Sequence, residues 1–418
     1  MTHATLENLA EQARAAQIIL ACQNGAARRH GLLSMADALM DAQDTIMAAN
    51  HADLAAAKDS NLSDASMDRM SLSPARILGM INGVRAIADQ PDPLGQITEQ
   101  WTRPNGLKFS RITVPIGTIG MIFESRPNVA AEAGAIAVLS GNAIILRGGS
   151  ECFRSNAAII SALRQGLAAA SLPANVIQMV PTADRAWVSH MLKLVGLIDL
   201  IIPRGGQSLI RLVQQESRLP VLAHLDGNCH VYVHGSAKID QAVSVVVNAK
   251  MRRVGVCGAA ESLVFDDISA KTHMKEIVNS LLDAGCAVRG DARVQTCDGR
   301  VTAASEDDWR AEYLAPIISA CVVDDAAAAI AHINKYGSHH TDAILAEDEA
   351  AIAAFYAQID SAIVLANAST QFADGGEFGF GGEIGIATGK FHARGPVGAA
   401  QLTSYKYVLR GRGQIRPV

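Results

Sequence analysis

Aromatic side chains are scarce in this chain. Phe, Trp and Tyr together make up 4% of its 418 residues, although apolar residues of all kinds make up 49%. The hydrophobic cores must therefore consist mainly of Ala, Val, Ile and Leu, which suits helices packed on a parallel sheet better than an all-β sandwich. The length allows two or three domains. We expect an α/β protein.

An excess of positive charge is also missing. The net charge is −5 and no basic stripe is visible, which argues against nucleic-acid binding. No apolar run reaches the roughly 18 residues of a membrane span, and the N-terminus has no basic segment leading into an apolar one. We expect a soluble cytoplasmic protein with neither nucleic-acid nor membrane partners.

Paired disulfide or metal-binding motifs are absent. The seven cysteines are scattered and never spaced as Cys-x-x-Cys, so we predict neither a disulfide framework nor a thiolate zinc site, and a reducing cytoplasm fits. His339 and His340 are adjacent before a predicted strand, where neighbouring side chains point to opposite faces. We do not expect them to share an ion, and we predict no metal site.

The dinucleotide fingerprint Gly-x-Gly-x-x-Gly is missing as well, so a standard Rossmann binding mode is not predicted. Two other glycine turns, Arg147–Gly149 and Arg204–Gly206, each follow a predicted strand. Backbone N–H groups at such turns attract phosphate, and ligands of parallel sheets lie at the carboxyl ends of the strands. The turns are therefore either cofactor contacts, with Arg147 at a phosphate or ribose, or ordinary strand-to-helix turns with a capping or surface arginine.

The elements that are present indicate two α/β units. Strands and helices alternate from 113 to 217 and again after 230, which implies parallel sheets with right-handed crossovers. Asn105-Gly106 lies between two alternating runs and predicts a β-hairpin over 97–113, whose edge can pair with another subunit. The N-terminal region reads as helices at 6–22, 24–49, 50–57 and 74–89.

We expect four segments along the chain. Residues 1–228 form a cofactor-binding domain that contains the 97–113 hairpin, and 229–362 form a catalytic domain. The glycine-rich segment 363–390 returns to the cofactor domain and supplies active-site loops, and 391–418 is an oligomerisation tail. The hairpin and the tail predict a dimer or a higher oligomer.

The chemistry is expected at Cys257. This residue lies in a loop between Gly255 and Gly258, which give the backbone freedom to present a side chain. Lys250, Arg252 and Arg253 add positive charge nearby in the sequence, and positive charge favours the nucleophilic thiolate. The alternative is a buried cysteine that acts as a small hydrophobe.

Seven separated motifs carry one resemblance. They are Val114–Asn128, Gly141–Gly149, Leu200–Gly206, Val247–Lys250, Asn367–Thr370, Asp374–Gly376 and His392–Pro396. With these motifs the chain resembles the gamma-glutamyl phosphate reductases (glutamate-5-semialdehyde dehydrogenases), a family of the aldehyde dehydrogenase superfamily. The resemblance implies an aldehyde dehydrogenase-like fold: a parallel-sheet cofactor domain, an α/β catalytic domain and a small β oligomerisation element.

The resemblance also implies a reaction in proline biosynthesis. The expected reaction is NADPH-dependent reduction of L-glutamyl 5-phosphate to L-glutamate 5-semialdehyde and phosphate, through a cysteine thioester and thiohemiacetal. The expected partners are this small substrate, further copies of the chain and, transiently, glutamate 5-kinase.

Residue roles follow from the matched motifs. Cys257 matches the family nucleophile and Asn128 the asparagine that binds the oxyanion. The expected cofactor contacts are Arg147, Gly148 and Gly149 at a ribose or phosphate, Gly205 and Gly206 at the pyrophosphate, and Glu312 at the nicotinamide ribose.

Substrate contacts are less specific. Lys250 and Arg253 either neutralise the departing phosphate or are structural. The groups that hold the substrate's amino and carboxylate ends are expected in 367–394, with Asn367, His392 and Arg394 as candidates.

One segment departs from the wider superfamily. Aldehyde-oxidising members place a water-activating glutamate in a Glu-Leu-Gly-Gly segment. The matching segment here is His224–Gly227, which begins 33 residues (257 − 224) before Cys257 and lacks the glutamate. An activated water would destroy the thioester, so its absence fits a reductase of acyl phosphates. The alternative is that His224 simply ends a strand and the alignment is shifted.

Two rival interpretations stay open. One is an aldehyde dehydrogenase-like enzyme that acts on another acyl donor, such as an acyl-CoA, and the tail motifs argue against it. The other is a catalytically silent scaffold for a partner such as glutamate 5-kinase, and Cys257, Asn128 and Glu312 argue against it. Thiol labelling near neutral pH separates a live site from a silent one.

Overall fold

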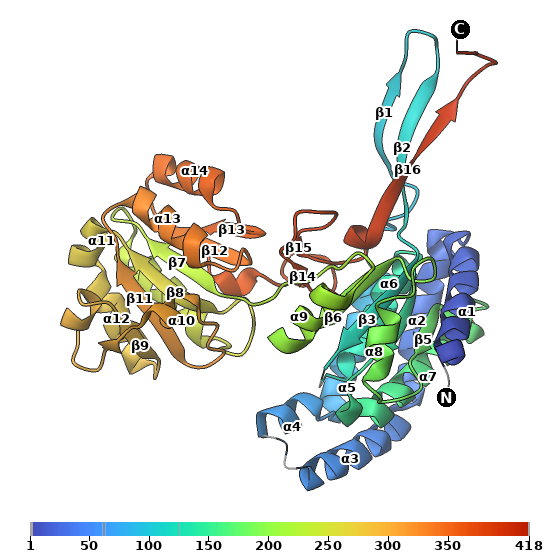
Figure 1. Ribbon diagram of the computed structural model, residues 1–418, viewed down its shortest axis with the longest axis horizontal. Coiled ribbons are helices and arrows are strands. Elements are labelled where there is room, and N and C mark those ends of the chain that lie inside the picture. The colour runs from blue at the N-terminus through green and yellow to red at the C-terminus, as the bar shows by residue number, and fades with distance from the viewer. Residues whose placement is uncertain (1–2, 61, 63, 125, 417–418) are drawn as a thin grey trace. The chain divides into compact units, whose positions relative to one another are not determined.

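The computed structural model describes residues 3–60, 62, 64–124 and 126–416, and these form two compact units (Figure 1). Unit 1 comprises Met1–Ala223, Gly379–Gly385 and Val397–Val418, and unit 2 comprises His224–Phe378 and Ile386–Pro396. No helix among the described residues is long and apolar enough to cross a membrane.

The unit boundaries correct the predicted domain limits in the second half of the chain. Residues 363–378 were predicted to return to the first domain but belong to unit 2, because strand β13 (Ile363–Ala366) pairs with β12 (Thr341–Leu345). Residues 391–396 belong to unit 2 instead of the tail, because β15 (Gly395–Pro396) pairs with β14 (Ile386–Ala387).

Unit 1 contains a parallel sheet of four strands in the order β5-β4-β3-β6. Its central strand β3 is buried at every position, as expected of a parallel strand covered on both faces. The strands are β3 (Thr118–Phe123), β4 (Ala143–Arg147), β5 (Ile177–Met179) and β6 (Leu200–Arg204). Their connecting helices are α6 (Asn128–Leu139), α7 (Phe153–Ala169), α8 (Ala186–Met191) and α9 (Gln207–Glu216). The predicted parallel sheet is confirmed.

The N-terminal region of unit 1 is helical, as predicted. The helices are α1 (His3–Ala21), α2 (Gly25–Asp41), α3 (Gln43–Asp59), α4 (Asp64–Met70) and α5 (Pro74–Ala88). The single helix expected over 24–49 is wrong: α2 ends at Asp41, and Ala42 leaves the helical conformation with ψ near 6°. Gly166 of α7 lies against the main chain of α2, since an added Cβ would come within 2.5 Å of Met35 Cα.

A separate antiparallel sheet in unit 1 consists of β1 (Ile97–Thr102), β2 (Lys108–Pro115) and β16 (Thr403–Arg410). The predicted hairpin is confirmed, and Gly106 provides the positive φ of 82° that its turn needs. The C-terminal strand β16 pairs with β2 over its full length, from Thr403 opposite Pro115 to Arg410 opposite Lys108. The tail strand therefore completes a sheet within its own chain.

Unit 2 is built on a parallel sheet of seven strands in the order β10-β9-β11-β8-β7-β12-β13. Alternate residues of its central strands enter different cores: Val231 and Leu263 pack with α10 and α12, whereas Tyr232 and Val264 pack with α13 and α14. The other strands are β7 (Cys229–Val233), β8 (Ala260–Phe265), β9 (Ala287–Gly290), β10 (Thr302–Ala303) and β11 (Ile317–Val322). The helices are α10 (Ile239–Met251), α11 (Asp267–Thr272), α12 (Met274–Asp283), α13 (Ala326–Tyr336) and α14 (Glu349–Gln358).

Candidate active site

Cys257 lies in the turn that connects α10 to β8. The N–H of Ala259 donates to the carbonyl of Val256 (3.0 Å), which closes the turn around the cysteine. The side chain of Gln371 holds the loop from the other side, because its Nε2 donates to the carbonyls of Ala249 (2.9 Å) and Arg253 (3.2 Å). The cysteine itself is half-buried and packs against the cluster of Ile363, Ala373 and Ile386.

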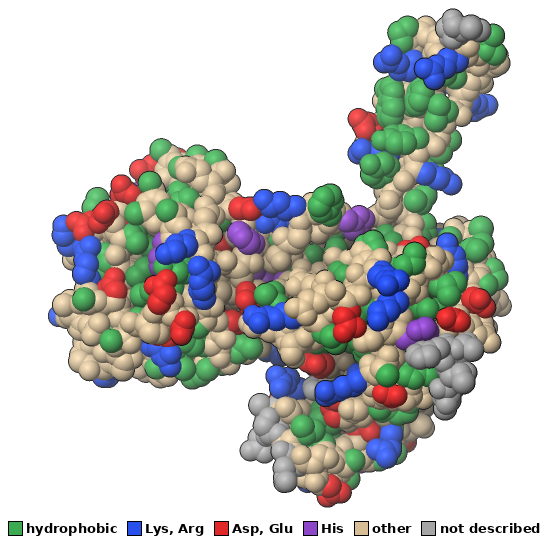
Figure 2. Space-filling model, in the orientation of Figure 1, with side chains coloured by type: hydrophobic (Ala, Val, Ile, Leu, Met, Phe, Trp, Pro, Cys, Tyr) green, Lys and Arg blue, Asp and Glu red, His purple; other side chains and the backbone are tan. Residues whose placement is uncertain are grey.

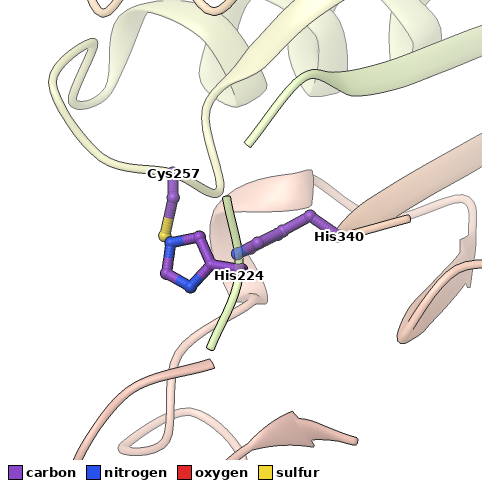
Figure 3. Close-up of side chains that lie close together, drawn as sticks. All are labelled: His224, Cys257 and His340. Carbon is purple, nitrogen blue, oxygen red and sulfur yellow. The ribbon is translucent and has the colours of Figure 1, made fainter. Parts of the chain in front are cut away.

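The imidazole of His224 lies beside the sulfur of Cys257 (Figure 3). Its Nδ1 is 2.8 Å from the carbonyl oxygen of Ile386. A carbonyl only accepts hydrogen bonds, so Nδ1 carries a proton and donates it. The carbonyl therefore fixes the tautomer and leaves Nε2 for the sulfur.

A second imidazole, that of His340, lies near the sulfur of Cys257 and belongs to the residue just before β12. His340 is fully buried, and its Nδ1 lies 2.9 Å from Thr341 Oγ1 and 3.6 Å from Cys229 Sγ. Its Nε2 has no hydrogen-bond partner. The rings of His224 and His340 are 5.2 Å apart in an edge-on arrangement, and one ligand atom from each ring and Sγ of Cys257 all lie within 4.8 Å of one another (Figure 3).

The two imidazoles decide the charge of the sulfur. Burial raises the pKa of Cys257, but the charge of His340, a hydrogen bond from His224 and the charge of His224 outweigh it and hold that pKa well below the ordinary thiol value. Burial lowers the pKa of His224, but its hydrogen bond to Cys257 and the charge of that sulfur outweigh burial and raise it to about 8. A thiolate beside an imidazolium is therefore the stable form near neutral pH.

The predicted source of positive charge needs correction. Lys250 is fully buried, and its ammonium donates to the equally buried carboxylate of Glu261 on β8. Burial raises the pKa of Glu261 to about 7 despite the opposing charge of Lys250. This pairing favours the structural alternative for Lys250 and leaves the cysteine dependent on the histidines. Arg253, by contrast, is exposed.

The main chain of Cys257 is braced from the segment before β7. An added Cβ on Gly227 would come within 2.2 Å of the Cys257 carbonyl oxygen, so only glycine fits there. Glu312 Oε1 accepts the Gly227 N–H at 3.0 Å, and the Cys229 thiol donates to the Cys257 carbonyl at 3.1 Å. Of the predicted site residues, the structure thus brings Glu312 and Cys257 together.

The predicted cofactor turn after β4 contains buried donors without partners. Arg147 is buried and donates from Nη2 to the carbonyl of Ala183 (2.9 Å), while its Nε has no partner. The amide of Asn156, also buried, has no partner at either atom. It lies against Gly148, where an added Cβ would come within 2.1 Å of Asn156 Nδ2. A polar ligand at this turn would satisfy these groups.

The other predicted residues of unit 1 have different surroundings. At the turn after β6, the N–H of Gly206 donates to Glu124 Oε2 (3.0 Å), and Gly205 also lies against that carboxylate. Gly149 lies against Glu151. Asn128 is exposed at the first position of α6, and its oxyanion role stays a prediction.

The candidate substrate residues of 367–394 are largely engaged. The Asn367 amide pairs with both main-chain groups of Ala346, at 2.8 and 3.0 Å. Arg394 donates to the carboxylate (2.9 Å) and the carbonyl (3.0 Å) of Asp360. His392 is exposed with a positive φ of 66°. Asn367 and Arg394 therefore hold the fold in this structure.

Sequence reasoning missed His340 and saw His224 only as the replacement of a glutamate. His339 and His340 do lie apart: His339 is exposed and bonds the carbonyl of Asp360 (2.6 Å), whereas His340 is buried. Both residues precede β12 and His339 has a positive φ of 60°, so the strand-alternation rule is not the reason for their separation. That rule gives no reason to look for a partner of His340. The signal available in the sequence was a histidine immediately before the amino-terminal end of a predicted strand.

Known proteins are similar to this chain in both sequence and fold. Residues 1–286 match the model of the aldehyde dehydrogenase family. Curated gamma-glutamyl phosphate reductases from Paramagnetospirillum magneticum and Afipia carboxidovorans are 54% and 55% identical to the chain, covering 99% of it and 98% and 97% of the relatives. The crystal structure of gamma-glutamyl phosphate reductase from Thermotoga maritima matches with a TM-score of 0.96 and 40% identity, covering 98% of this chain and 99% of the other. The chain therefore belongs to the aldehyde dehydrogenase family, on its gamma-glutamyl phosphate reductase branch.

Proposed function

We propose that this enzyme reduces L-glutamyl 5-phosphate to L-glutamate 5-semialdehyde and phosphate with NADPH, as a step of proline biosynthesis in the cytoplasm. The observation that carries the proposal is the position of His224 and His340 beside the sulfur of Cys257, in a chain that is 54% identical to a curated gamma-glutamyl phosphate reductase. These imidazoles lower the pKa of that thiol. The name of this relative supports the substrate, and the thiolate supports covalent catalysis.

The residues at the turn after β4 fit a polar cofactor group. Arg147 Nε and the Asn156 amide are buried without partners beside Gly148, and such groups gain a hydrogen bond when a ribose or phosphate oxygen arrives. We propose that this turn, with Gly205 and Gly206, binds NADPH, and that Glu312 contacts the nicotinamide ribose. When bound, NADPH supplies the hydride that the reduction needs.

The first chemical step belongs to Cys257. Its thiolate attacks the carbonyl carbon of the acyl phosphate, a carbon–sulfur bond forms, and the carbon–oxygen bond to phosphate breaks. His224 and His340 keep the sulfur ionised before this attack. Asn128 is the proposed donor to the oxyanion, and Arg253 is the proposed contact of the departing phosphate.

His224 and His340 also stabilise the sulfur when the product leaves. The carbon–sulfur bond breaks as the aldehyde leaves, and the sulfur returns to His224 and His340 as a thiolate. His224 Nδ1 remains occupied by the Ile386 carbonyl, so this ring has only Nε2 to offer the sulfur side. At position 224, where the matching segment of aldehyde-oxidising relatives has its water-activating glutamate, this chain therefore has an imidazole.

Replacing the nucleophile tests the proposal. We expect Cys257→Ala to abolish phosphate-dependent reduction of NADP⁺ by glutamate 5-semialdehyde, the reverse reaction, while NADPH binding measured by fluorescence is unchanged. Cys22→Ser is the control, since Cys22 is an exposed thiol of unit 1, and it should keep full activity. Turnover by Cys257→Ala would remove the covalent step.

The same assay separates the rival functions. Replacing phosphate by coenzyme A should give no NADP⁺ reduction, and replacing NADP⁺ by NAD⁺ should lower the rate. Activity with coenzyme A alone would identify an acyl-CoA reductase. A protein that is inactive with either acceptor, and whose Cys257 labels no faster than Cys22 near neutral pH, would be a scaffold.

A further inference from the structure

We propose that His224, Cys257 and His340 also form a binding site for a thiophilic divalent cation, Zn²⁺, and that the bound ion reversibly blocks the nucleophile. The ion-binding part stands on geometry alone. The blocking part rests on the proposed role of Cys257 in catalysis.

The three side chains converge on one point from three segments: the residues before β7, the turn after α10 and the residue before β12 (Figure 3). Their ligand atoms all lie within 4.8 Å of one another. Zinc–sulfur and zinc–nitrogen bonds of about 2.3 and 2.1 Å in a tetrahedral site place ligand atoms about 3.4 to 3.6 Å apart. Side-chain rotations that move each ligand atom inward by about 1 Å would reach that spacing.

Each imidazole is already oriented as a metal ligand. The Ile386 carbonyl accepts the Nδ1 proton of His224 (2.8 Å), and a carbonyl behind the ring is the usual support that fixes a metal-binding histidine. Behind the His340 ring, Thr341 Oγ1 lies 2.9 Å from Nδ1. The Nε2 atom of His340 is buried without any partner, and Figure 3 shows this ring directed toward His224 and Cys257.

The donor set selects the ion. One thiolate and two imidazoles suit Zn²⁺ and disfavour Mg²⁺ and Ca²⁺, which prefer oxygen ligands. Three protein ligands leave a fourth position open to water, so the ion can enter and leave. An ion on Sγ occupies the electron pair that Cys257 would use to attack a carbonyl, which makes the ion an inhibitor.

Cobalt substitution tests the binding site without any turnover. Co²⁺ added to the full-length reduced protein should produce, at one equivalent, a near-ultraviolet thiolate-to-cobalt absorption and the intense visible bands of a tetrahedral site. Zn²⁺ should displace both. Cys257→Ser should lose the near-ultraviolet absorption, and His224→Asn and His340→Asn should each weaken binding at least about tenfold.

The matched control is His339→Asn, which changes the adjacent exposed histidine and suits its positive φ of 60°. It should bind Co²⁺ as the unchanged protein does. No absorption at equimolar Co²⁺, or absorption that persists in Cys257→Ser, would overturn the site. If His340→Asn does not fold, His224→Asn decides the histidine contribution.

Blocking is measured separately from binding. Zn²⁺ should protect Cys257 from iodoacetamide and inhibit turnover, whereas Mg²⁺ should do neither. EDTA added after Zn²⁺ should restore both the labelling of Cys257 and the turnover. A protein that shows the cobalt spectrum but is not inhibited by Zn²⁺ would keep the ion site and disprove the role of Cys257 as the nucleophile.

Discussion

Two imidazoles far away in the sequence control the reactivity of Cys257. His224 and His340 lie 33 and 83 residues from it (257 − 224 and 340 − 257) and outweigh the burial that would otherwise keep the thiol protonated. The lowered pKa of Cys257 and the raised pKa of His224 have one origin, because the negative thiolate and the positive imidazolium stabilise each other. Removing either ring should therefore change the charge state of the sulfur.

The pH dependence of alkylation tests this coupling. Because the pKa of Cys257 is lowered, its thiolate persists below the ordinary thiol pKa of about 8.5, and iodoacetamide labelling should stay nearly constant between about pH 6.5 and 8.5. In His224→Asn the labelling rate should fall several-fold at the acid end, since the donor to the thiolate is lost. Peptide mass spectrometry gives the rates, with Cys22 as the exposed reference. Identical profiles for both proteins would contradict the coupling.

Gly227 offers a test of how precisely the nucleophile is held. Its missing side chain leaves room for the carbonyl of Cys257, 2.2 Å from an added Cβ. Gly227→Ala should displace the cysteine and lower kcat about 100-fold, the effect expected of a 1 Å displacement. Gly255→Ala in the same loop region is the control, because an added Cβ there meets nothing within 4 Å. Equal activity of the two variants would show that the carbonyl can move freely.

The sequence identifies Cys257 but not the reason for its reactivity. A single cysteine between two glycines and the motif resemblance suffice to select it. The charge near it was assigned to Lys250 because that residue is close in sequence, and no local pattern reveals that Glu261 faces it from β8. His340 became visible only once β12 was placed in the sheet, since its role depends on a neighbour 83 residues away (340 − 257).

At the scale of elements, the ion pair of Lys250 and Glu261 joins α10 to β8 inside the core. Both side chains are fully buried, and Glu261 also accepts the N–H of Leu314 (3.2 Å). The pair therefore ties the helix that precedes the nucleophile to the loop that carries Glu312. Charged groups in such a position stabilise only as a pair.

Removing the charge of Lys250 alone should destabilise the protein more than removing the charges of both Lys250 and Glu261. Lys250→Met leaves Glu261 buried alone and should lower the free energy of unfolding by about 3 to 5 kcal/mol. The double variant Lys250→Met with Glu261→Gln removes both charges and keeps an acceptor for Leu314, so it should recover most of that loss. Urea unfolding followed by circular dichroism compares them. A double variant less stable than the single one would show that the ion pair itself stabilises the core.

Element boundaries were predictable where turn chemistry marks them. Asn105-Gly106 predicted the hairpin because its turn needs a positive φ, which Gly106 has. The end of α2 carries neither glycine nor proline, and Ala42 ends the helix without a side-chain cap. The sequence alone therefore contains no sign of this boundary.

At the scale of the whole molecule, the three-stranded sheet of unit 1 offers a surface for self-association. Trp101, Phe109 and Leu409 lie directly opposite one another across its three strands, and Trp101 stacks on Phe109 at 5.3 Å. Leu409 and Tyr407 are each about half exposed on the same face of β16. An exposed apolar row of this kind is typical of a subunit contact, and the dimer or higher oligomer stays a prediction.

Leu409→Asp tests that surface. A charge in the apolar row should disfavour association and shift the mass measured by light scattering toward that of a single chain. Val408→Asp places the same charge on the opposite face of the strand and should leave the mass unchanged. If both variants lose association, the contact lies at the edge of the strand. If both variants associate like the unchanged protein, the sheet is not part of the interface.

The chain passes between its two units four times, at 223/224, 378/379, 385/386 and 396/397. The carbonyl that fixes the His224 tautomer belongs to Ile386, just after the third passage. A polypeptide that ends before residue 386 therefore contains Cys257, His224 and His340 but lacks the carbonyl that fixes the tautomer of His224.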